Sequence, residues 1–472
     1  MKPMEPTTKP RLNAPCPEKS RLKRRAGQVN LRMWTLAGLC LLAVLCLALL
    51  SPAPLDATPA TTAGRFDKKI AAVTSEIVPS LIEIRRDIHA HPELGFREKR
   101  TSGIVADYFR RLGLEVRTGV GQTGVIAVLR GGKPGPVVAM RGDMDCLPIT
   151  EETGLPFASK EKVVIDGREI GLMHACGHDV HTTLLLGVAS ILARMRAEVP
   201  GTVVFVAQPS EEGPSGAKAM IDDGAFKDIK PDAFFAYHVE DTIKTGLVKY
   251  APGFMGANVD GFRLVVKSEG CHGAAPQNCV DPIVVGSHIV TALQVMISRE
   301  FDVKRDTLVT VGYFHAGAAS NVIPETAELR ATVRSYGEDQ RARLKERITR
   351  LITNLCEAAG AQFELDYGFG TPALYNDPAL TRAILPTVER ILGGKDRVIQ
   401  TEPEMGGEDF AYYSTIAPVV MLYLGVVPQD RTTDPVHSPG FVVDESAIPI
   451  GLNVMAAVIM DYLSGQRSGK GR

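Results

Sequence analysis

The sequence predicts an α/β protein of two domains, in which a smaller α+β domain is inserted into a larger α/β sheet domain. The chain's 472 residues exceed what one ordinary hydrophobic core accommodates. Short apolar strands alternate with helices over residues 66–252 and again over 369–465, an order typical of a sheet covered on both faces. Residues 253–368 instead follow a βαββα order, which is typical of an antiparallel sheet with helices on one face.

The spacing of apolar residues predicts each element of the larger domain. Ile70, Val73, Ile77 and Leu81 recur at intervals of three and four, which predicts a helix over 66–90. Similar patterns predict helices over 101–112, 182–196 and 378–392. Short apolar runs predict strands at 125–129, 136–140, 202–207, 233–236 and 419–424.

The inserted domain shows a different pattern. Residues 260–267 alternate between polar and apolar side chains, as a half-exposed strand does. A helix over 282–298, strands at 307–314 and 327–335, and a helix over 340–359 complete its predicted order.

The N-terminus predicts an export signal or a membrane anchor. Residues 1–32 form a basic leader, 33–50 are uncharged and apolar, and 51–65 read as a linker. As a helix, residues 33–50 would span roughly 27 Å, close to the thickness of a bilayer's hydrocarbon core. We therefore expect an exported protein, periplasmic or extracellular, anchored to the membrane by residues 33–50 if that segment is not cleaved.

The charge distribution argues against a nucleic-acid partner, and the cysteine content argues against a regular set of disulfides. Residues 1–50 hold nine Lys and Arg against two Glu, which leaves 44 basic and 52 acidic residues in the rest of the chain. That balance lacks the basic footprint of a nucleic-acid-binding protein, so no nucleic-acid partner is expected. Five of the eight cysteines follow residue 50, an odd number without regular spacing and hence a poor disulfide framework.

Metal-binding side chains follow the predicted strands of the larger domain. Asp143 and Asp145 come after one strand, Glu211 and Glu212 after another, and His238 after a third. Another loop, after the strand at 419–424, carries Asp434 and His437. Because ligands bind beyond the carboxyl ends of strands in open α/β sheets, these side chains are expected to share one edge.

The segment from His174 to His181 holds three His, one Cys and one Asp in eight residues. Thiolate and imidazole suit zinc and related metals, and the start of the following helix favours the thiolate form of Cys176. Taken singly, each feature has an ordinary structural explanation, such as a helix cap or a solvated turn. Their concentration at strand ends favours a metal site, in which one of two adjacent carboxylates binds metal and the other takes a proton from water.

The ordered motifs resemble those of the M20 metallopeptidases, in particular the amidohydrolase subfamily of hippurate hydrolases, N-acyl-amino-acid amidohydrolases and auxin-conjugate hydrolases. The resemblance covers nearly everything after residue 70. It rests on the segments 85–94, 141–145, 174–181, 208–212, 237–239, 321–324, 407–410 and 437–439.

This resemblance implies a site for two divalent ions, zinc or manganese, with cobalt or nickel as alternatives. It implies five metal ligands, namely Cys176, His178, Glu212, His238 and His437. Glu211 would be the general base and Asp145 would orient the site. The inserted domain would be a lid and dimerisation domain of a homodimer, whose His272 stabilises the oxyanion in the partner subunit. Asn321 and Arg334 would bind the substrate.

The lid motif departs from the family pattern of Gly-Gly-His-Ala-Ala followed by Pro-His. Here Gly270, Cys271, His272 and Gly273 are followed by Pro276 and Gln277, so the histidine is kept in changed surroundings. Cys271 and Cys279 flank this loop and are either small apolar filler or a disulfide pair.

The predicted function is hydrolysis of the amide bond of an N-acyl-amino acid or dipeptide with a free carboxylate. A dipeptidase or carboxypeptidase on the same scaffold is the nearest alternative, because only the acyl pocket would differ. A catalytically inactive binding protein is the third, although Glu211 and all five proposed ligands are present.

Overall fold

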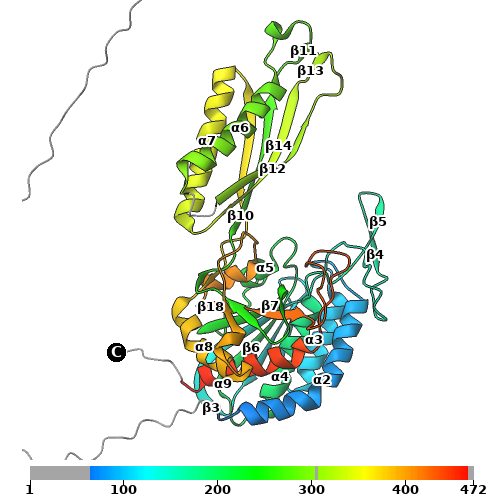
Figure 1. Cartoon of the computed structure of the whole chain (residues 1–472), viewed down its shortest axis with the longest axis vertical. Coiled ribbons are helices and arrows are strands. Elements are labelled where there is room, and N and C mark those ends of the chain that lie inside the picture. Colours follow the sequence, from blue (N-terminus) through cyan, green and yellow to red (C-terminus); the bar gives the residue numbers. More distant parts are fainter. Residues whose placement is uncertain (1–63, 303–306, 466–472) are drawn as a thin grey trace, which may run out of the picture. The chain divides into compact units, whose positions relative to one another are not determined.

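A computed structural model of the protein describes residues 64–302 and 307–465. Its largest sheet has eight strands in the order β1-β2-β6-β3-β7-β18-β8-β17 (Figure 1). The four central strands are parallel, so their carboxyl ends meet at one edge of the sheet. They are β6 (Pro200–Gln208), β3 (Lys133–Asp143), β7 (Ala233–Lys244) and β18 (Val419–Val427).

Shorter strands flank this parallel centre. On one side lie β1 (Glu115–Val120) and β2 (Gly124–Arg130), and on the other β8 (Val248–Tyr250) and β17 (Val398–Gln400). Two further two-stranded ladders are β4 (Lys162–Ile165) with β5 (Arg168–Gly171), and β9 (Gly253–Phe254) with β16 (Tyr375–Asn376).

Alternate side chains of the strands enter two hydrophobic cores, one on each face of the large sheet. On β6, Val203 and Phe205 face one core, whereas Val204 and Val206 face the other. The first core is covered by α2 (Asp67–Ala90), α3 (Lys99–Arg111), α4 (His178–Arg194), α8 (Pro378–Leu392) and α9 (Ala447–Leu463). The second is covered by α5 (Gly216–Asp222) and the 3-10 helix η3 (Asp409–Thr415). This confirms the predicted sheet with helices on both faces.

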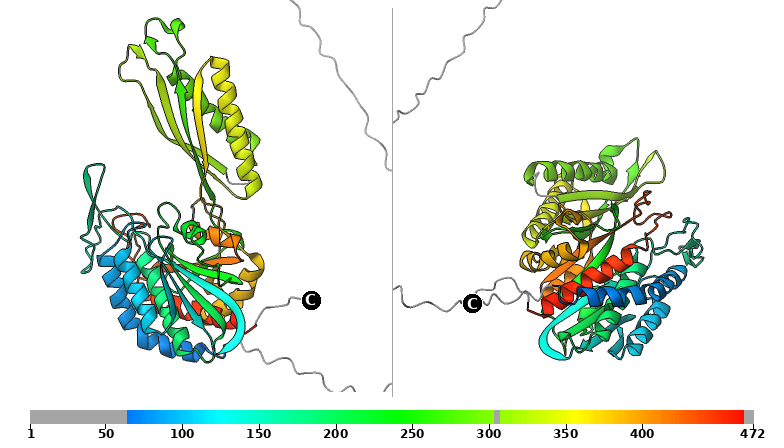
Figure 2. Two further views of the ribbon diagram at one scale, coloured as in Figure 1. Left: turned by 180° about the vertical axis from the view of Figure 1, so that it is seen from behind. Right: turned by 60° about the horizontal axis from the view of Figure 1, so that its bottom comes forward.

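A second sheet has four antiparallel strands in the order β12-β14-β10-β15, with two helices packed on one face (Figures 1 and 2). The strands are β10 (Asn258–Lys267), β12 (Thr307–Ala316), β14 (Thr326–Ser335) and β15 (Gln362–Phe369), and the helices are α6 (Pro282–Glu300) and α7 (Glu338–Ala359). Their core includes Leu264, Ile289, Leu329 and Ile348. At the end of this inserted domain, β11 (Cys271–His272) pairs with β13 (Val322–Ile323), beside η1 (Pro276–Asn278).

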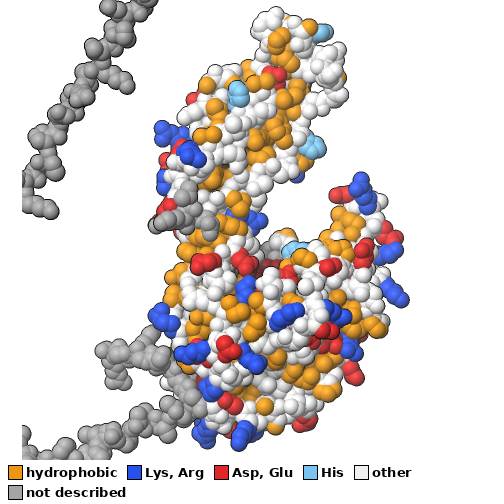
Figure 3. All heavy atoms as spheres, viewed as in Figure 1, with side chains coloured by type: hydrophobic (Ala, Val, Ile, Leu, Met, Phe, Trp, Pro, Cys, Tyr) orange, Lys and Arg blue, Asp and Glu red, His pale blue; other side chains and the backbone are white. Residues whose placement is uncertain are grey.

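The predicted helices and strands all occur, and most limits agree within a few residues, but β7 continues to Lys244, eight residues beyond its expected end. Several elements were missed. The sequence-based prediction omitted β1, the β4–β5 hairpin, β15, α5 and α9, as well as the short strands and the 3-10 helices, of which η2 spans Lys395–Arg397. The two-domain α/β arrangement is confirmed. On the face shown in Figure 3, Lys and Arg side chains are interspersed with Asp and Glu.

Candidate metal centre

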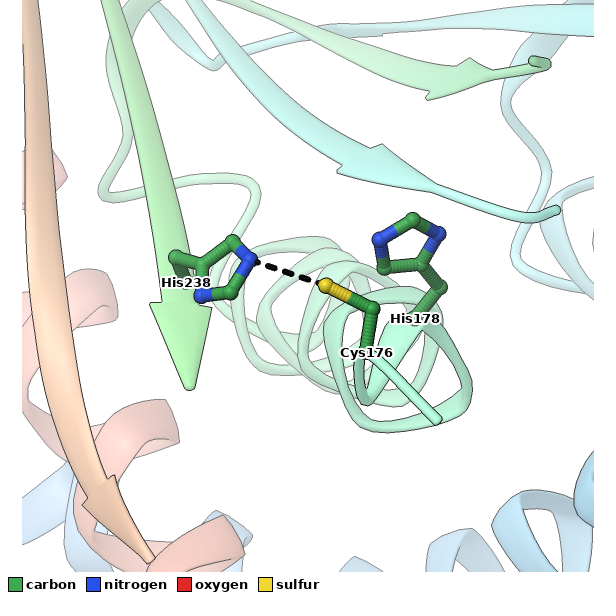
Figure 4. A group of neighbouring side chains, drawn as sticks. All are labelled: Cys176, His178 and His238. Atoms are coloured by element: carbon green, nitrogen blue, oxygen red, sulfur yellow. Dashed lines mark hydrogen bonds between the residues drawn. The ribbon is translucent and has the colours of Figure 1, made fainter. Parts of the chain in front are cut away.

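Three of the predicted ligands come together from β7 and from the start of α4. Cys176 Sγ lies 3.3 Å from His238 Nε2 (Figure 4), and both lie within 4.8 Å of a ring nitrogen of His178. Gly177, between Cys176 and His178, has a positive φ of 78°. A Cβ at this position would come within 2.6 Å of Val239 Cγ2, so this close approach of the loop to β7 requires glycine.

Glu212 and His437 extend this cluster. His437 Nε2 lies 3.0 Å from Glu212 Oε1, which in turn is 4.0 Å from His178 Nε2. Potential ligand atoms of Cys176, Glu212 and His437 lie within 4.8 Å of one another, as do those of His178, Glu211 and Glu212. The structure therefore brings together all five predicted ligands and the predicted base.

The donor atoms fit a divalent cation. His178 Nε2 is buried without a hydrogen-bond partner, although its Nδ1–H donates to the Asp145 carbonyl and carboxylate at 2.9 and 3.1 Å. His238 Nδ1–H similarly donates to the Val239 carbonyl, which leaves Nε2 facing Cys176. Zinc and related metals are usually bound by imidazoles whose second nitrogen is held by a hydrogen bond, together with thiolates and carboxylates.

Asp145 connects two of these residues. Its Oδ1 accepts from His178, while its Oδ2 accepts from the Glu212 backbone N–H at 3.0 Å. A single buried carboxylate therefore fixes both a ring and a backbone segment of the cluster.

His181 and His174 lie outside the predicted ligand set, although a ring nitrogen of His181 lies within 4.8 Å of potential ligand atoms of Asp143 and His178. His181 Nδ1–H donates to Asp143 at 2.7 Å and its Nε2 accepts from the Val239 N–H at 2.9 Å, so both nitrogens are occupied. His174 belongs to none of the candidate metal groups among the described residues, and burial lowers its pKa to about 3. The motif thus contains one histidine of the predicted ligand set, His178, and two histidines outside that set.

The Cys176 thiol differs from the expectation that the helix start would favour a thiolate. Burial raises the pKa of Cys176 well above its usual range, and the Glu212 carboxylate raises it further. A cation bound at Sγ would reverse this preference, because a coordinating thiol loses its proton.

Behind the cluster lies a buried charge network around Arg141. Its guanidinium lies 2.5 Å from Asp143 and 2.9 Å from Glu408, and it donates to Gln208 at 2.9 Å. Burial alone would raise the pKa of Asp143, but Arg141 and the neighbouring histidines hold it well below its usual range. By contrast, burial raises the pKa of Asp409 to about 7.

Glu211 lies where this network meets the ligands. A Glu211 carboxylate oxygen lies within 4.8 Å of carboxylate oxygens of Glu408 and Asp409. A Glu211 oxygen also lies within 4.8 Å of a ring nitrogen of His178 and a carboxylate oxygen of Glu212. Burial and these neighbouring carboxylates raise the pKa of Glu211 well above its usual range.

Two residues of the site have strained backbones. Ser210, before Glu211, has a φ of 49°, and His437 has a φ of 63°. Glu98, which the sequence-based prediction missed, accepts the Ser210 N–H at 2.8 Å, and the His437 N–H donates to Ala175 at 2.8 Å. Such conformations cost about 1–3 kcal/mol each and persist only where the surroundings hold them.

A second buried network joins Asp179 of α4 to α2. Asp179 Oδ2 lies 2.7 Å from Arg85 Nε and 2.8 Å from His89 Nδ1, while His89 Nε2 is 3.2 Å from Glu151. Burial acts to lower the pKa of His89, but the two carboxylates outweigh it and the pKa is raised. His89 thus links α2 to the helix that begins with a predicted ligand.

The predicted substrate-binding residues lie in the inserted domain. His272 is exposed on β11, and Asn321 lies beside it, since the Asn321 carbonyl accepts the Gly273 N–H at 2.7 Å. Among the described residues, neither forms a hydrogen bond or ion pair with the metal-binding groups. Arg334 lies elsewhere, on β14 beside Gly407, and has no carboxylate within ion-pair distance in the described part of the chain.

An α/β sheet with parallel central strands, candidate Cys, His and Glu donors at one edge and a further carboxylate beside them is the arrangement expected of a metal-dependent hydrolase. Residues 139–461 match the profile of Peptidase family M20/M25/M40. The chain belongs to this family and is a metal-dependent hydrolase of amide bonds.

Relatives and solved structures agree with this assignment. The chain is 36% identical to a thermostable carboxypeptidase of Saccharolobus solfataricus, with 84% of this chain and 98% of the relative covered. It is 35% identical to an N-acetylcysteine deacetylase of Bacillus subtilis (81% and 97% covered) and 36% identical to an IAA-amino acid hydrolase of Arabidopsis thaliana (85% and 89%). A dinuclear metal-binding peptidase of the M20 family from Bacillus subtilis superposes with a TM-score of 0.71 at 32% identity, with 83% of this chain and 99% of that chain covered.

The predicted export and membrane anchoring are wrong. The relatives, matched over nearly their whole length, are amide hydrolases whose names describe no exported or membrane-bound enzyme. In the described part of the chain, the one helix long and apolar enough to cross a membrane is α6, whose Val285 and Ile289 pack into the core of the inserted domain. Residues 33–50 lie outside the described residues.

Proposed function

We propose that the enzyme hydrolyses the amide bond of N-acyl-amino acids, using two divalent ions held by Cys176, His178, Glu212, His238 and His437. The observation that carries this proposal is the position of Glu211, a carboxylate outside the proposed ligand set but within 4.8 Å of both His178 and Glu212. Zinc or manganese suits the mixed sulfur, nitrogen and oxygen donors, and cobalt or nickel are alternatives.

The bound ions would supply Lewis acidity at the amide carbonyl and lower the pKa of water towards neutrality. The Glu211 carboxylate accepts the proton of the attacking water and later donates it to the nitrogen of the leaving amine. Asp145 keeps His178 and the Glu212 backbone in place during these transfers, through the two hydrogen bonds of its carboxylate.

The inserted domain would bind the rest of the substrate. Arg334 is a half-buried cation whose Nε donates to Thr332 and which forms no ion pair at contact distance in the described part of the chain, so it suits the free carboxylate of the substrate. Asn321 would hold the substrate amide, and His272 would donate a hydrogen bond to the oxyanion.

A homodimer would complete the site. In this proposal residues 253–368 are a lid and dimerisation domain, and residues 66–252 and 369–465 form the catalytic domain. His272 would act in the partner subunit, which accords with the absence, among the described residues, of any hydrogen bond between His272 and the metal-binding groups of its own chain.

A carboxypeptidase or dipeptidase is the second candidate, because a carboxypeptidase is among the relatives. A panel of N-acetyl-amino acids, N-benzoyl-amino acids and dipeptides, offered to the metal-loaded enzyme, separates the two. We expect the N-acyl compounds to be cleaved fastest and their C-terminal carboxamides slowly, because Arg334 would lose its partner. Preferential cleavage of dipeptides would favour the second candidate, and equal cleavage of the carboxamides would contradict the role of Arg334.

A further inference from the structure

A disulfide closes the loop that carries His272. It joins Cys271 to Cys279 across a sequence separation of eight residues, so His272 lies inside a small covalent ring. This resolves the two alternatives that the sequence left open for these cysteines. Cys146, Cys176 and Cys356 are free and buried, whereas both cysteines of the disulfide are only partly buried.

One side of the ring is fixed to the rest of the inserted domain. Cys271 pairs with Ile323 and His272 with Val322 across the β11–β13 ladder, and the Gly273 N–H donates to the Asn321 carbonyl at 2.7 Å. These contacts fix the His272 backbone relative to Asn321, which is also proposed to contact the substrate.

The other side of the ring has few ties. From Ala274 to Asn278 the residues are exposed or half-buried, and among the described residues their backbone hydrogen bonds stay within the loop. The His272 ring itself accepts only the Ala274 N–H, at 3.0 Å. The disulfide thus holds the Cys279 end of the loop against β11, whereas the hydrogen bonds of Ala274 and Ala275 to His272 hold only the residues next to β11.

The disulfide is also accessible from solvent. Cys279 lines a surface cavity of about 530 Å³ together with Ser268, Glu269 and Gln277. Exposed disulfides exchange readily with external thiols, because the attacking thiolate needs a path to one of the two sulfurs.

We propose that the Cys271–Cys279 disulfide is a reversible positioning device for His272, so that the enzyme is more active when these cysteines are oxidised than when they are reduced. The proposal rests on the proposed function, since it takes His272 as the oxyanion donor. Cys271 and Cys279 touch no reacting atom and act only through the loop that they close.

The chemistry is a thiol–disulfide exchange with a dithiol. One thiolate of the dithiol attacks a sulfur of the disulfide, the S–S bond breaks and a mixed disulfide forms. The second thiol of the reagent then displaces the remaining protein sulfur. The protein gains two electrons and two protons as Cys271 and Cys279 thiols, and the dithiol is oxidised to its own cyclic disulfide.

Steady-state kinetics of the full-length, metal-loaded enzyme test the proposal, with dithiothreitol as the dithiol and its oxidised form for reversal. We expect reduction to lower kcat and kcat/KM about tenfold with little change in KM, because a loop placed less accurately loses an interaction made in the transition state. Reoxidation should restore both constants. Mass spectrometry would follow the redox state of Cys271 and Cys279, and metal analysis would confirm equal loading.

A matched variant and a loop variant complete the experiment. The double variant Cys271→Ser, Cys279→Ser should show the lower kcat and ignore dithiothreitol, which also controls for effects of the reagent on the metal or on Cys176. His272→Ala should lose about 10²–10³-fold in kcat, as for removal of an oxyanion donor, and should no longer respond to reduction. Protease cleavage within residues 273–278 should be faster in the reduced enzyme than in the oxidised enzyme. A melting temperature measured for the double variant checks that this variant folds.

Other outcomes overturn the proposal and separate it from the proposed function. If reduction leaves kcat unchanged while His272→Ala is impaired, the disulfide does not position His272, but the proposed function stands. If His272→Ala keeps full activity, the role of His272 fails and the positioning proposal fails with it. If the double variant still responds to dithiothreitol, the response originates elsewhere.

Discussion

Asp179→Asn tests whether the buried network of Asp179, Arg85 and His89 stabilises the first turn of α4, which begins with His178. Asp179 is fully buried, and its carboxylate lies 2.7 Å from Arg85 Nε and 2.8 Å from His89 Nδ1. The asparagine keeps the shape but removes the charge, which leaves a guanidinium that is only 2% exposed with one carboxylate, that of Glu445 at 3.3 Å.

The expected loss follows from this geometry. Removing one partner of a buried ion pair costs about 3–5 kcal/mol, because the other charge stays buried without compensation. Since Glu445 remains near Arg85, we expect the lower end, about 3 kcal/mol of unfolding free energy.

Urea unfolding in the presence of a chelator measures this loss without a contribution from metal binding. Asp222→Asn is the matched control, because it removes the same charge from the exposed pair with Lys218 and should leave stability unchanged. A loss for Asp179→Asn below about 1 kcal/mol, similar to that of the control, would refute the electrostatic reasoning.

Three further predictions concern packing, titration and substrate binding. Gly187→Ala on α4 should cost about 1–3 kcal/mol, because a Cβ there would come within 2.4 Å of a leucine of α9. Gly103→Ala on α3, where nothing lies within 4 Å, should instead stabilise by about 0.5–1 kcal/mol, and urea unfolding compares the two. The pKa of His89 is raised above 6.5, so its stabilisation is complete below that pH and fades as the pH rises through the folded pKa. His89→Gln should therefore cost more stability at about pH 6 than at about pH 9, and a cost that grows with pH would contradict the sign. Arg334→Gln should raise KM about tenfold for substrates with a free carboxylate and hardly at all for their carboxamides, which initial-rate measurements would show.

The fold was predictable where side-chain spacing reflects burial. The amphipathic helix α2 shows a clear periodicity because it buries one face. The central strands bury both faces and therefore appear in the sequence as short apolar runs. The helix α9 was missed because it is buried on nearly all sides and has no polar face to reveal a helical period. The strand β15 was missed because it is short, is only partly buried and begins three residues after the end of α7.

The candidate site was predictable only in part, for a similar reason. Glu212 and His437 follow strands as expected, and Cys176 and His178 lie at the start of α4, but His238 lies within β7 and not after it. The residue types of all five alone indicate metal binding. The network of Arg141 could not be assembled from the sequence, because Glu408 lies 267 residues further along the chain. Nor does sequence spacing show that both nitrogens of His181 are used within the protein, since one partner is a backbone N–H of β7.

The role of Glu211 as the base of a metal-dependent hydrolysis is tested by comparing Glu211→Gln with the wild-type enzyme at equal metal content. We expect both proteins to bind the same amount of zinc or manganese, kcat of the variant for an N-acetyl-amino acid to fall about 10²–10⁴-fold, and a chelator to abolish wild-type turnover. Full activity of the metal-loaded Glu211→Gln variant, or wild-type turnover that survives removal of the metal, would contradict it.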